Sequence, residues 1–247
     1  MHPLESRFKR AIETAYAQPM DYLIYDIKLS SQPKYPQFFN NFSVGYLLSQ
    51  NPLLKFAQGK TLPLSDGAGF FVHINPGALP RIFTVNCVVV ASEEEQLWQL
   101  VSGDLREAAY VSSSVYKELQ ESYGWRNLGE SFSFADLQDK NKIMHINIDN
   151  PNYIEIDIDV SVPAMLVFTE VWYPGWEASV DSQSKPLYRI NYCQRGVWVQ
   201  EGTHNVKLKF RPVAWRLGLV VSTGTIILIS GIGLAAGIRR ILKLKSK

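Results

Sequence analysis

Apolar and polar residues alternate with a period of two in the segment NYIEIDIDVSV, residues 152–162. Successive side chains of a β-strand point to opposite faces of a sheet. The alternation therefore predicts a strand that buries one face and exposes the other. The buried face would carry Ile154, Ile156, Ile158 and Val160, and the outer face Glu155, Asp157 and Asp159.

Short apolar segments continue beyond this strand at AMLVFTEVW, WEASVD, PLYRI, RGVWVQ and HNVKLKF. Turn residues separate them at Pro174-Gly175, Asp181-Ser182 and Glu201-Gly202. Several short strands with a turn every 8 to 12 residues or so, about the spacing seen here, are typical of two packed antiparallel sheets. We therefore predict an antiparallel β-sandwich domain over residues 136–212.

The N-terminal half has a mixed pattern. Residues 4–15 carry apolar side chains at helical spacing and predict an amphipathic helix. Ser92, followed by three glutamates, predicts the N-cap and acidic first turn of a helix that ends near Leu100. Together these elements predict a small α+β domain over residues 1–135. Its strand-like segments are Asp21–Leu29, Phe42–Gln50, Phe70–Ile74 and Ile82–Val90, with a turn at Asn75–Pro80.

The longest apolar segment, Leu217–Ile238, has 22 residues and no charge. As a helix it would extend over roughly 33 Å, compared with about 30 Å for the hydrocarbon core of a bilayer. Trp215 precedes it, and residues 239–247 are basic and contain no acid. The pattern predicts a transmembrane helix over residues 213–238 and, by the positive-inside rule, a cytoplasmic tail over residues 239–247.

The predicted fold class is therefore α+β to mostly β: a small α+β domain, an antiparallel β-sandwich and one C-terminal transmembrane helix. The expected location is a membrane, with the lipid bilayer as a partner and the N-terminal portion outside the cytoplasm. Gly233 and Gly237 form a Gly-x-x-x-Gly pattern, which marks a candidate contact with a helix of another membrane protein or subunit.

The N-terminal segment conflicts with this orientation, because it lacks the apolar core of a signal peptide. Two explanations stay open. The sequence is either the C-terminal piece of a longer protein with several spans, which we favour, or its large N-terminal portion faces the cytoplasm.

Composition excludes several classes of function. The chain has 25 basic and 23 acidic residues and no basic stripe, so nucleic acid is not an expected partner. The four histidines are scattered, and neither a CxxC nor an HExxH motif occurs, so we expect no metal and no other cofactor. Cys87 and Cys193 lie far apart in the sequence and are expected to be free thiols.

Six short motifs follow one another along the chain. They are GYLLSQNPL at Gly45–Leu53, NPGALPRIF at Asn75–Phe83, Tyr173-Pro174-Gly175-Trp176, Val180-Asp181-Ser182, Asn191-Tyr192 and Gly202–Val206. In type and order they resemble the C-terminal region of YfhO-type bacterial membrane proteins. In that family a strand ends in a YYPGW-like corner, and an Asn-Tyr strand precedes a Gly-x-His-x-Val strand.

This resemblance implies a location in the bacterial cytoplasmic membrane and a relation to cell-envelope glycosylation. YfhO-type proteins are similar to GT-C glycosyltransferases, which use lipid-linked sugars and carry an acidic catalytic residue in their first extracytoplasmic loop. No position of this chain matches that loop, so no catalytic residue is carried over. The chain alone is therefore not expected to be an enzyme.

Aromatic and acidic residues around the Tyr173–Trp176 corner form a candidate contact site for a glycan or a partner. Aromatic faces stack on sugar rings, and carboxylates accept hydrogen bonds from hydroxyl groups. The alternative, which we favour, is that the aromatic residues fill the core of the sandwich. The candidate residues are Trp172, Tyr173, Trp176, Glu177, Asp181 and Tyr192.

Asp157 and Asp159 are interpreted as solvated acids of the outer face of a strand rather than as a catalytic or calcium-binding pair.

Two hypotheses of function follow from the whole sequence. The first is an extracytoplasmic module of a glycosyltransferase, non-catalytic alone, that contacts glycan or acceptor. The second is a single-span accessory or structural subunit of a larger membrane protein complex.

Overall fold

A computed structural model describes residues 7, 10–11, 37–49, 61–63, 71–124 and 134–245. The predicted strand at Asp21–Leu29 and most of the predicted N-terminal helix lie outside the described residues. The chain divides into two compact units. The first consists of Met1–Tyr173 and Glu177–Lys209, and the second of Pro174–Trp176 and Phe210–Lys247.

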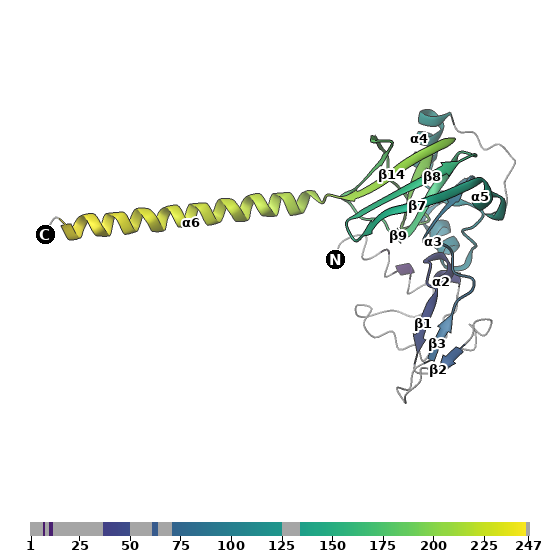
Figure 1. The fold of residues 1–247 in the computed structure, drawn as a ribbon, viewed down its shortest axis with the longest axis horizontal. Coiled ribbons are helices and arrows are strands. Elements are labelled where there is room, and N and C mark those ends of the chain that lie inside the picture. The colour runs from purple at the N-terminus through teal and green to yellow at the C-terminus, as the bar shows by residue number, and fades with distance from the viewer. Residues whose placement is uncertain are drawn as a thin grey trace. The chain divides into compact units, whose positions relative to one another are not determined.

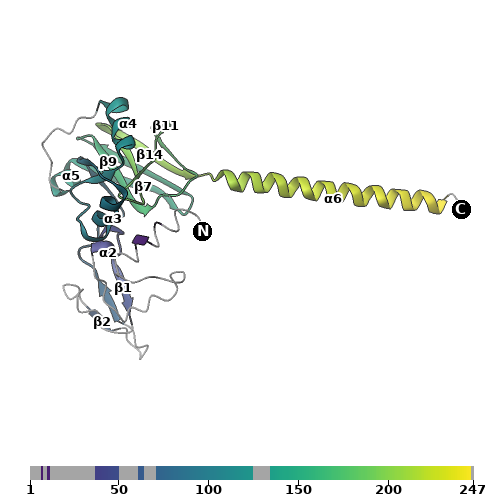
Figure 2. The same cartoon turned by 180° about the vertical axis from the view of Figure 1, so that it is seen from behind.

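The elements of the chain are shown in Figures 1 and 2. The helices are α2 (Gln37–Asn41), α3 (Glu93–Ser102), α4 (Ser113–Tyr123), α5 (Phe134–Lys140) and α6 (Val213–Lys245). The strands are β1 (Tyr46–Ser49), β2 (Thr61–Pro63), β3 (Phe71–Ile74), β4 (Ile82–Val85), β5 (Val88–Val90), β6 (Ala109–Val111), β7 (Asn141–Asn150), β8 (Tyr153–Val160), β9 (Ala164–Val171), β10 (Trp176–Val180), β11 (Gln183–Lys185), β12 (Tyr188–Ile190), β13 (Gln194–Val199) and β14 (Gly202–Phe210).

The described strands form four sheets. The largest has five strands in the order β11-β10-β14-β8-β7, and the next has four in the order β12-β13-β9-β4. A three-stranded sheet has the order β1-β3-β2, and β5 pairs with β6 in parallel. The predicted mostly β fold with antiparallel sheets is confirmed by the pairs β8–β14, β7–β8, β9–β13 and β4–β9.

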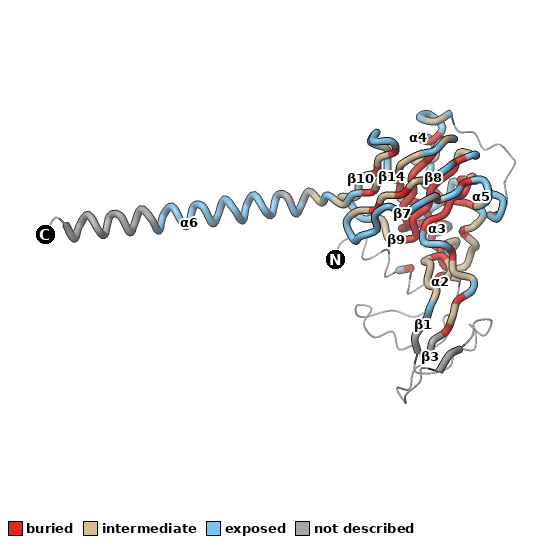
Figure 3. Tube along the Cα trace, viewed as in Figure 1, coloured by how far each residue is buried: buried red, intermediate tan, exposed pale blue. Residues whose placement is uncertain are grey.

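Strand β9 is buried on both faces, from Ala164 to Thr169. Met165 and Val167 belong to a cluster with Leu97 and Leu100 of α3, so one face of the four-stranded sheet packs against helices. Alternate residues of a strand point the other way, and Figure 1 shows the five-stranded sheet on that side. The core therefore has three layers, and buried residues run through the middle one (Figure 3).

Strand β8 follows the predicted alternation. Ile154, Ile156, Ile158 and Val160 are at most 2 % exposed, whereas Asp159 lies in solvent. Burial of an aliphatic side chain of this size stabilises the fold by about 1.5–3 kcal/mol. The pattern therefore fixes which face of the five-stranded sheet turns to the core.

Helix α3 begins as predicted. The Ser92 hydroxyl accepts a hydrogen bond from the backbone N–H of Glu95 at 3.3 Å, and the Glu95 carboxylate accepts one from the N–H of Ser92 at 2.7 Å. This capping box satisfies two backbone donors that the first turn of a helix leaves without partners.

The apolar segment Ile82–Val90 does not form the single predicted strand. It divides at Asn86 and Cys87 into β4, which joins the four-stranded sheet, and β5, which pairs with β6. The break lets the two halves pair with different strands, β4 with β9 and β5 with β6. Helix α3 then connects the parallel strands β5 and β6. Both cysteines are free thiols, as expected.

A turn between β12 and β13 carries two residues with positive φ, Asn191 (48°) and Tyr192 (71°). Left-handed backbone costs roughly 1–2 kcal/mol for a residue with a Cβ, although asparagine adopts it more readily than most. Hydrogen bonds hold this conformation. The backbone N–H of Asn191 donates to the carbonyl of Tyr110 at 2.7 Å, and the N–H of Tyr192 donates to the Gln96 side chain at 2.9 Å.

The Asn191 side chain extends these bonds into a buried polar network. Its Oδ1 accepts from the N–H of Tyr110 at 2.8 Å, and its Nδ2 donates to Gln194 at 2.9 Å. Gln194 donates to the carbonyl of Asn41 at 2.6 Å, and the Asn41 amide donates to the carbonyls of Leu100 and Gly103, each at 2.9 Å. The network therefore connects the β12–β13 turn with β6, α2 and α3.

The predicted transmembrane helix over Leu217–Ile238 is wrong. These residues lie in α6, which runs from Val213 to Lys245. To cross a bilayer, a helix needs about 20 consecutive, predominantly apolar residues. Among the described residues, no helix combines the length and the apolarity that a crossing requires. The fold class is therefore corrected to mostly antiparallel sheet with helices and without an assigned transmembrane element.

We expect Asn191→Gly and Asn191→Ala to separate the two roles of Asn191. Glycine keeps the left-handed backbone but removes both side-chain hydrogen bonds, so we expect a loss of about 1–3 kcal/mol in the free energy of unfolding. Alanine should add about 1 kcal/mol or more of backbone strain. Urea unfolding measures both values, and a glycine variant as stable as the unmodified chain would show that the network does not stabilise the fold.

Candidate functional site

The six candidate contact residues do not form one exposed platform. In the first unit, Tyr173 is 40 % exposed, and Glu177 and Asp181 also lie in solvent. Trp172 is half-buried, and its indole donates to the carbonyl of Leu187 at 3.3 Å. The indole is therefore oriented by a backbone contact.

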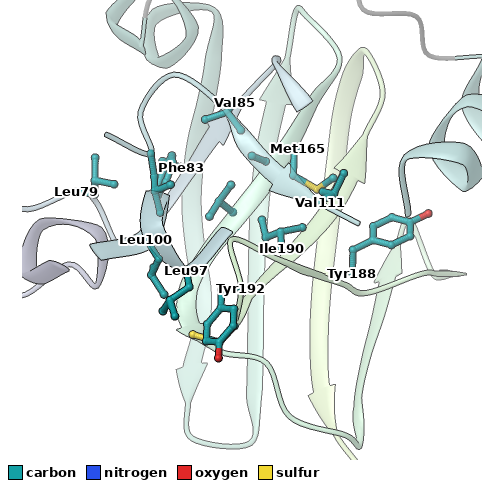
Figure 4. Close-up of a cluster of buried hydrophobic side chains, with 14 of the residues drawn as sticks. Leu79, Phe83, Val85, Leu97, Leu100, Val111, Met165, Tyr188, Ile190 and Tyr192 are labelled. Carbon is teal, nitrogen blue, oxygen red and sulfur yellow. The ribbon is translucent and has the colours of Figure 1, made fainter. Parts of the chain in front are cut away.

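Tyr192 lies in the core of the first unit and is 2 % exposed. Figure 4 shows its ring near Leu97 in the buried apolar cluster. The guanidinium carbon of Arg7 lies 5.2 Å from the ring centroid. Burial raises the pKa of the Tyr192 hydroxyl, against the opposing effect of Arg10 and Arg7. In this conformation Tyr192 is a core residue and not an accessible stacking surface.

In the second unit, the Pro174–Trp176 corner packs against the residues that lead into α6. Trp176 and Phe210 have ring centroids 5.3 Å apart, and the N–H of Arg211 donates to the carbonyl of Gly175 at 2.5 Å. Gly175 has φ 105°, and a Cβ there would lie 2.8 Å from the Cα of Pro212. The corner therefore requires glycine for both its backbone conformation and its close approach.

Two motifs that lie apart in the sequence meet at one end of the five-stranded sheet. The Asp181 carboxylate lies 2.6 Å from Nδ1 of His204 and accepts from the N–H of Asn205 at 2.9 Å. Gly202 has φ 129°, and a Cβ at this position would lie 3.2 Å from the His204 ring. The Asp181 turn is thereby fixed to the first residues of β14.

The pKa of Asp181 lies below its ordinary value. Partial burial acts to raise it, but the hydrogen bonds from His204 and from the Asn205 backbone outweigh that effect. Asp181 is therefore held as an ionised acceptor.

The outer face of the five-stranded sheet carries a connected set of polar groups, here called the Asn205 network. It consists of Asn147 on β7, Tyr153, Glu155 and Asp157 on β8, and Asn205 and Lys207 on β14. These three strands are neighbours in the sheet. The network therefore forms one continuous polar surface.

Asn205 is the centre of this network. Its Nδ2 donates to Asp157 at 2.7 Å and to Glu155 at 3.1 Å. Asn147 donates to the second oxygen of Asp157 at 2.9 Å, and the Tyr153 hydroxyl donates to Glu155 at 2.6 Å. These contacts orient the carboxylates on the solvent-facing side of the sheet.

Hydrogen bonds to the ionised forms lower the pKa of both carboxyl groups. For Glu155 the largest cause is the bond from Tyr153, and for Asp157 it is the bond from Asn205. Both groups therefore keep their negative charge below the pH at which an ordinary carboxyl group takes up a proton. Sequence patterning indicated only solvated acids here, because the cross-strand partners come from distant segments.

A second charged cluster, which the sequence did not reveal, lies around Glu170. Its carboxylate forms ion pairs with Arg81 and, at 2.9 Å, with Arg195, and Arg81 also pairs with Asp149 of β7. Burial lowers the pKa of Arg195, while Glu170 opposes the shift. These contacts join β7 of the five-stranded sheet to β9 and β13 of the four-stranded sheet, through Arg81, which directly precedes β4.

Two further expectations concern α6 and metals. Gly233 is exposed in α6, with no heavy atom within 4 Å of a Cβ built there, and Gly237 lies in the same helix. The helix contact predicted for this pair stays a prediction. In the described part of the chain, no three His, Cys, Asp or Glu side chains are close enough together to hold a metal ion.

Comparisons with protein families, with curated proteins and with solved structures found no match to this chain.

Gly175→Ala should destabilise the corner more than Gly124→Ala destabilises the end of α4. Both glycines have positive φ, but a Cβ at Gly124 meets nothing within 4 Å. The difference between the variants therefore reports the clash with Pro212 together with the greater backbone strain of alanine at φ 105° than at 59°, for which we expect about 1–3 kcal/mol. Hydrogen exchange of the Arg211 amide reports the loss locally. Equal effects of the two substitutions would contradict the role assigned to the close approach.

Proposed function

We propose that this chain is a non-catalytic extracytoplasmic module that contacts glycan, or the glycan acceptor, for a bacterial cell-envelope glycosyltransferase. The observation that carries the proposal is the Asn205 network. The resemblance of six sequence motifs to the YfhO-type family supplies the biological setting. Two of these motifs, around Asp181 and His204, form one contact in the structure.

The chemistry of the network suits a ligand rich in hydroxyl groups. A carboxylate oxygen accepts more than one hydrogen bond, so Glu155 and Asp157 retain acceptor capacity beyond the contacts to their neighbours. Asn147 and Asn205 each have an amide that donates and a carbonyl oxygen that accepts. Because these groups are already oriented by one another, less conformational entropy is lost when a ligand binds.

The charges of the network favour a neutral glycan over an anionic polymer. Glu155 and Asp157 stay ionised. Asp159 lies on the same face of β8, and Asp181 accepts a hydrogen bond from the backbone N–H of Asn205. Lys207, 3.3 Å from Glu155, compensates part of this negative charge. A sugar hydroxyl can donate to these carboxylates without the repulsion that a phosphate would meet.

The same pKa directions support a binding role rather than a hydrolytic one. Glycoside hydrolysis requires a carboxylic acid that stays protonated near neutral pH, and therefore a raised pKa. Glu155, Asp157 and Asp181 all shift in the opposite direction. They are suited to accept hydrogen bonds and not to donate a proton to a leaving group.

The test is a titration of the full chain with neutral oligosaccharides of glucose, galactose and N-acetylglucosamine, followed by saturation-transfer NMR and calorimetry. We expect Glu155→Ala and Asn205→Ala each to weaken binding by about tenfold, the equivalent of losing one hydrogen bond to a charged group. Glu121→Ala is the matched control, because Glu121 lies in solvent on α4 and pairs only weakly with Lys117 at 3.6 Å.

Binding should also persist to a lower pH than the ordinary pKa values of these side chains would allow, because hydrogen bonds lower the pKa of both carboxyl groups and keep them ionised. The proposal fails if the unmodified chain binds none of these oligosaccharides. It also fails if the two network variants bind as tightly as the control.

A further inference from the structure

The described side chains from Leu217 to Gly233 of α6 are all exposed to solvent (Figure 3). Its large apolar members are between 56 % and 72 % exposed. They are Leu217, Leu219, Val220, Val221, Ile226, Ile227, Leu228, Ile229 and Ile232. Soluble proteins rarely expose a contiguous apolar surface of more than a few hundred Å², so this surface indicates a partner.

The distribution of these residues around the helix identifies the kind of partner. Ile226, Ile227, Leu228 and Ile229 are consecutive, and successive residues of an α-helix are rotated by about 100°. Together the four side chains therefore cover most of the circumference. A docking helix covers a single stripe of about 100°. A lipid surface adapts to apolar side chains spread over most of the circumference, whereas a groove that fits a single stripe does not.

Polar groups within the helix fit the same environment. The Thr223 hydroxyl donates to the carbonyl of Leu219 at 2.7 Å, and the Thr225 hydroxyl donates to that of Val221 at 2.8 Å. Both hydroxyl groups are thus satisfied inside the helix. They need no water, so their transfer into hydrocarbon costs less than that of an unbonded hydroxyl group.

Charge complementarity points to an anionic lipid surface. The sequence after Ile238 has five basic residues within nine positions and no acid. Each lysine or arginine near an anionic membrane surface contributes a favourable attraction. The aromatic residue before the apolar segment, Trp215, is 73 % exposed, and tryptophan favours the boundary between lipid and water.

We propose that the apolar surface of α6 is a lipid-binding site that associates with a bilayer containing anionic phospholipids. The proposal concerns binding and does not assign a crossing of the bilayer. It is independent of the glycan contact proposed for the five-stranded sheet, because the two rest on different residues.

The experiment synthesises the full chain in a cell-free system with vesicles of phosphatidylglycerol and phosphatidylethanolamine, and measures the fraction that floats with the vesicles. Ile226→Asp combined with Ile229→Asp places two charges on the apolar surface. We expect it to reduce the vesicle-bound fraction by about tenfold or more. The matched control is Ile146→Asp combined with Ile148→Asp, at exposed positions of β7.

The control should float like the unmodified chain. Circular dichroism of all three proteins checks that the sheets are folded. The proposal is overturned if the unmodified chain does not float, or if the α6 variant floats as well as the control. It is also overturned if native mass spectrometry without vesicles shows a dimer that the α6 substitutions abolish, since a second copy would then cover this surface.

Discussion

The hydrogen bonds around Asn191 hold together parts of the first unit that are far apart in the sequence. One side chain bonds to the backbone of β6 and, through Gln194 and Asn41, to the end of α3. Each bond contributes only about 1 kcal/mol, but an unsatisfied buried polar group costs about 1–3 kcal/mol. The network is therefore strongly selective for one arrangement of α2, α3, β6 and the β12–β13 turn. It also compensates for the left-handed backbone of Asn191 and Tyr192.

This constraint also explains why Tyr192 is unavailable to a ligand. The turn directs its ring into the cluster that contains Leu97, and Arg7 lies over the ring. The polar surface proposed here to contact a ligand lies elsewhere, on the outer face of the five-stranded sheet. There, Asn205 fixes two carboxylates that belong to a neighbouring strand.

Features with a local cause could be predicted from the sequence. The alternation in β8 and the N-cap with its acidic first turn in α3 each depend on a few neighbouring residues, and both are confirmed. The division of Ile82–Val90 could not be predicted, because it depends on two different partner strands. Similarly, Ser112 caps α4 in a serine-rich segment whose helical character depends on the packing of Leu119 in the core.

The candidate site likewise has features that the sequence indicated and contacts that only the fold creates. Sequence patterning identified Asp181 and His204 as parts of separate motifs, but only the fold brings them within 2.6 Å of each other. Sequence patterning also placed Asp157 correctly on an outer face, without indicating its bonds to Asn147 and Asn205.

The hydropathy of the C-terminal segment led to the wrong fold class, because hydropathy of a segment does not by itself establish a helix that crosses a bilayer. The predicted domain boundary between residues 135 and 136 stays a prediction.

The central claim is that the Asn191 network couples the helices of the first unit to its sheets. Hydrogen exchange measured across a series of urea concentrations tests it most directly, by comparing the amides of α3 (Glu93–Ser102) with those of β8 (Tyr153–Val160). If the claim is correct, both sets converge on one global unfolding reaction with the same free energy and the same dependence on urea. Two separate reactions, with α3 opening while β8 stays protected, would contradict it.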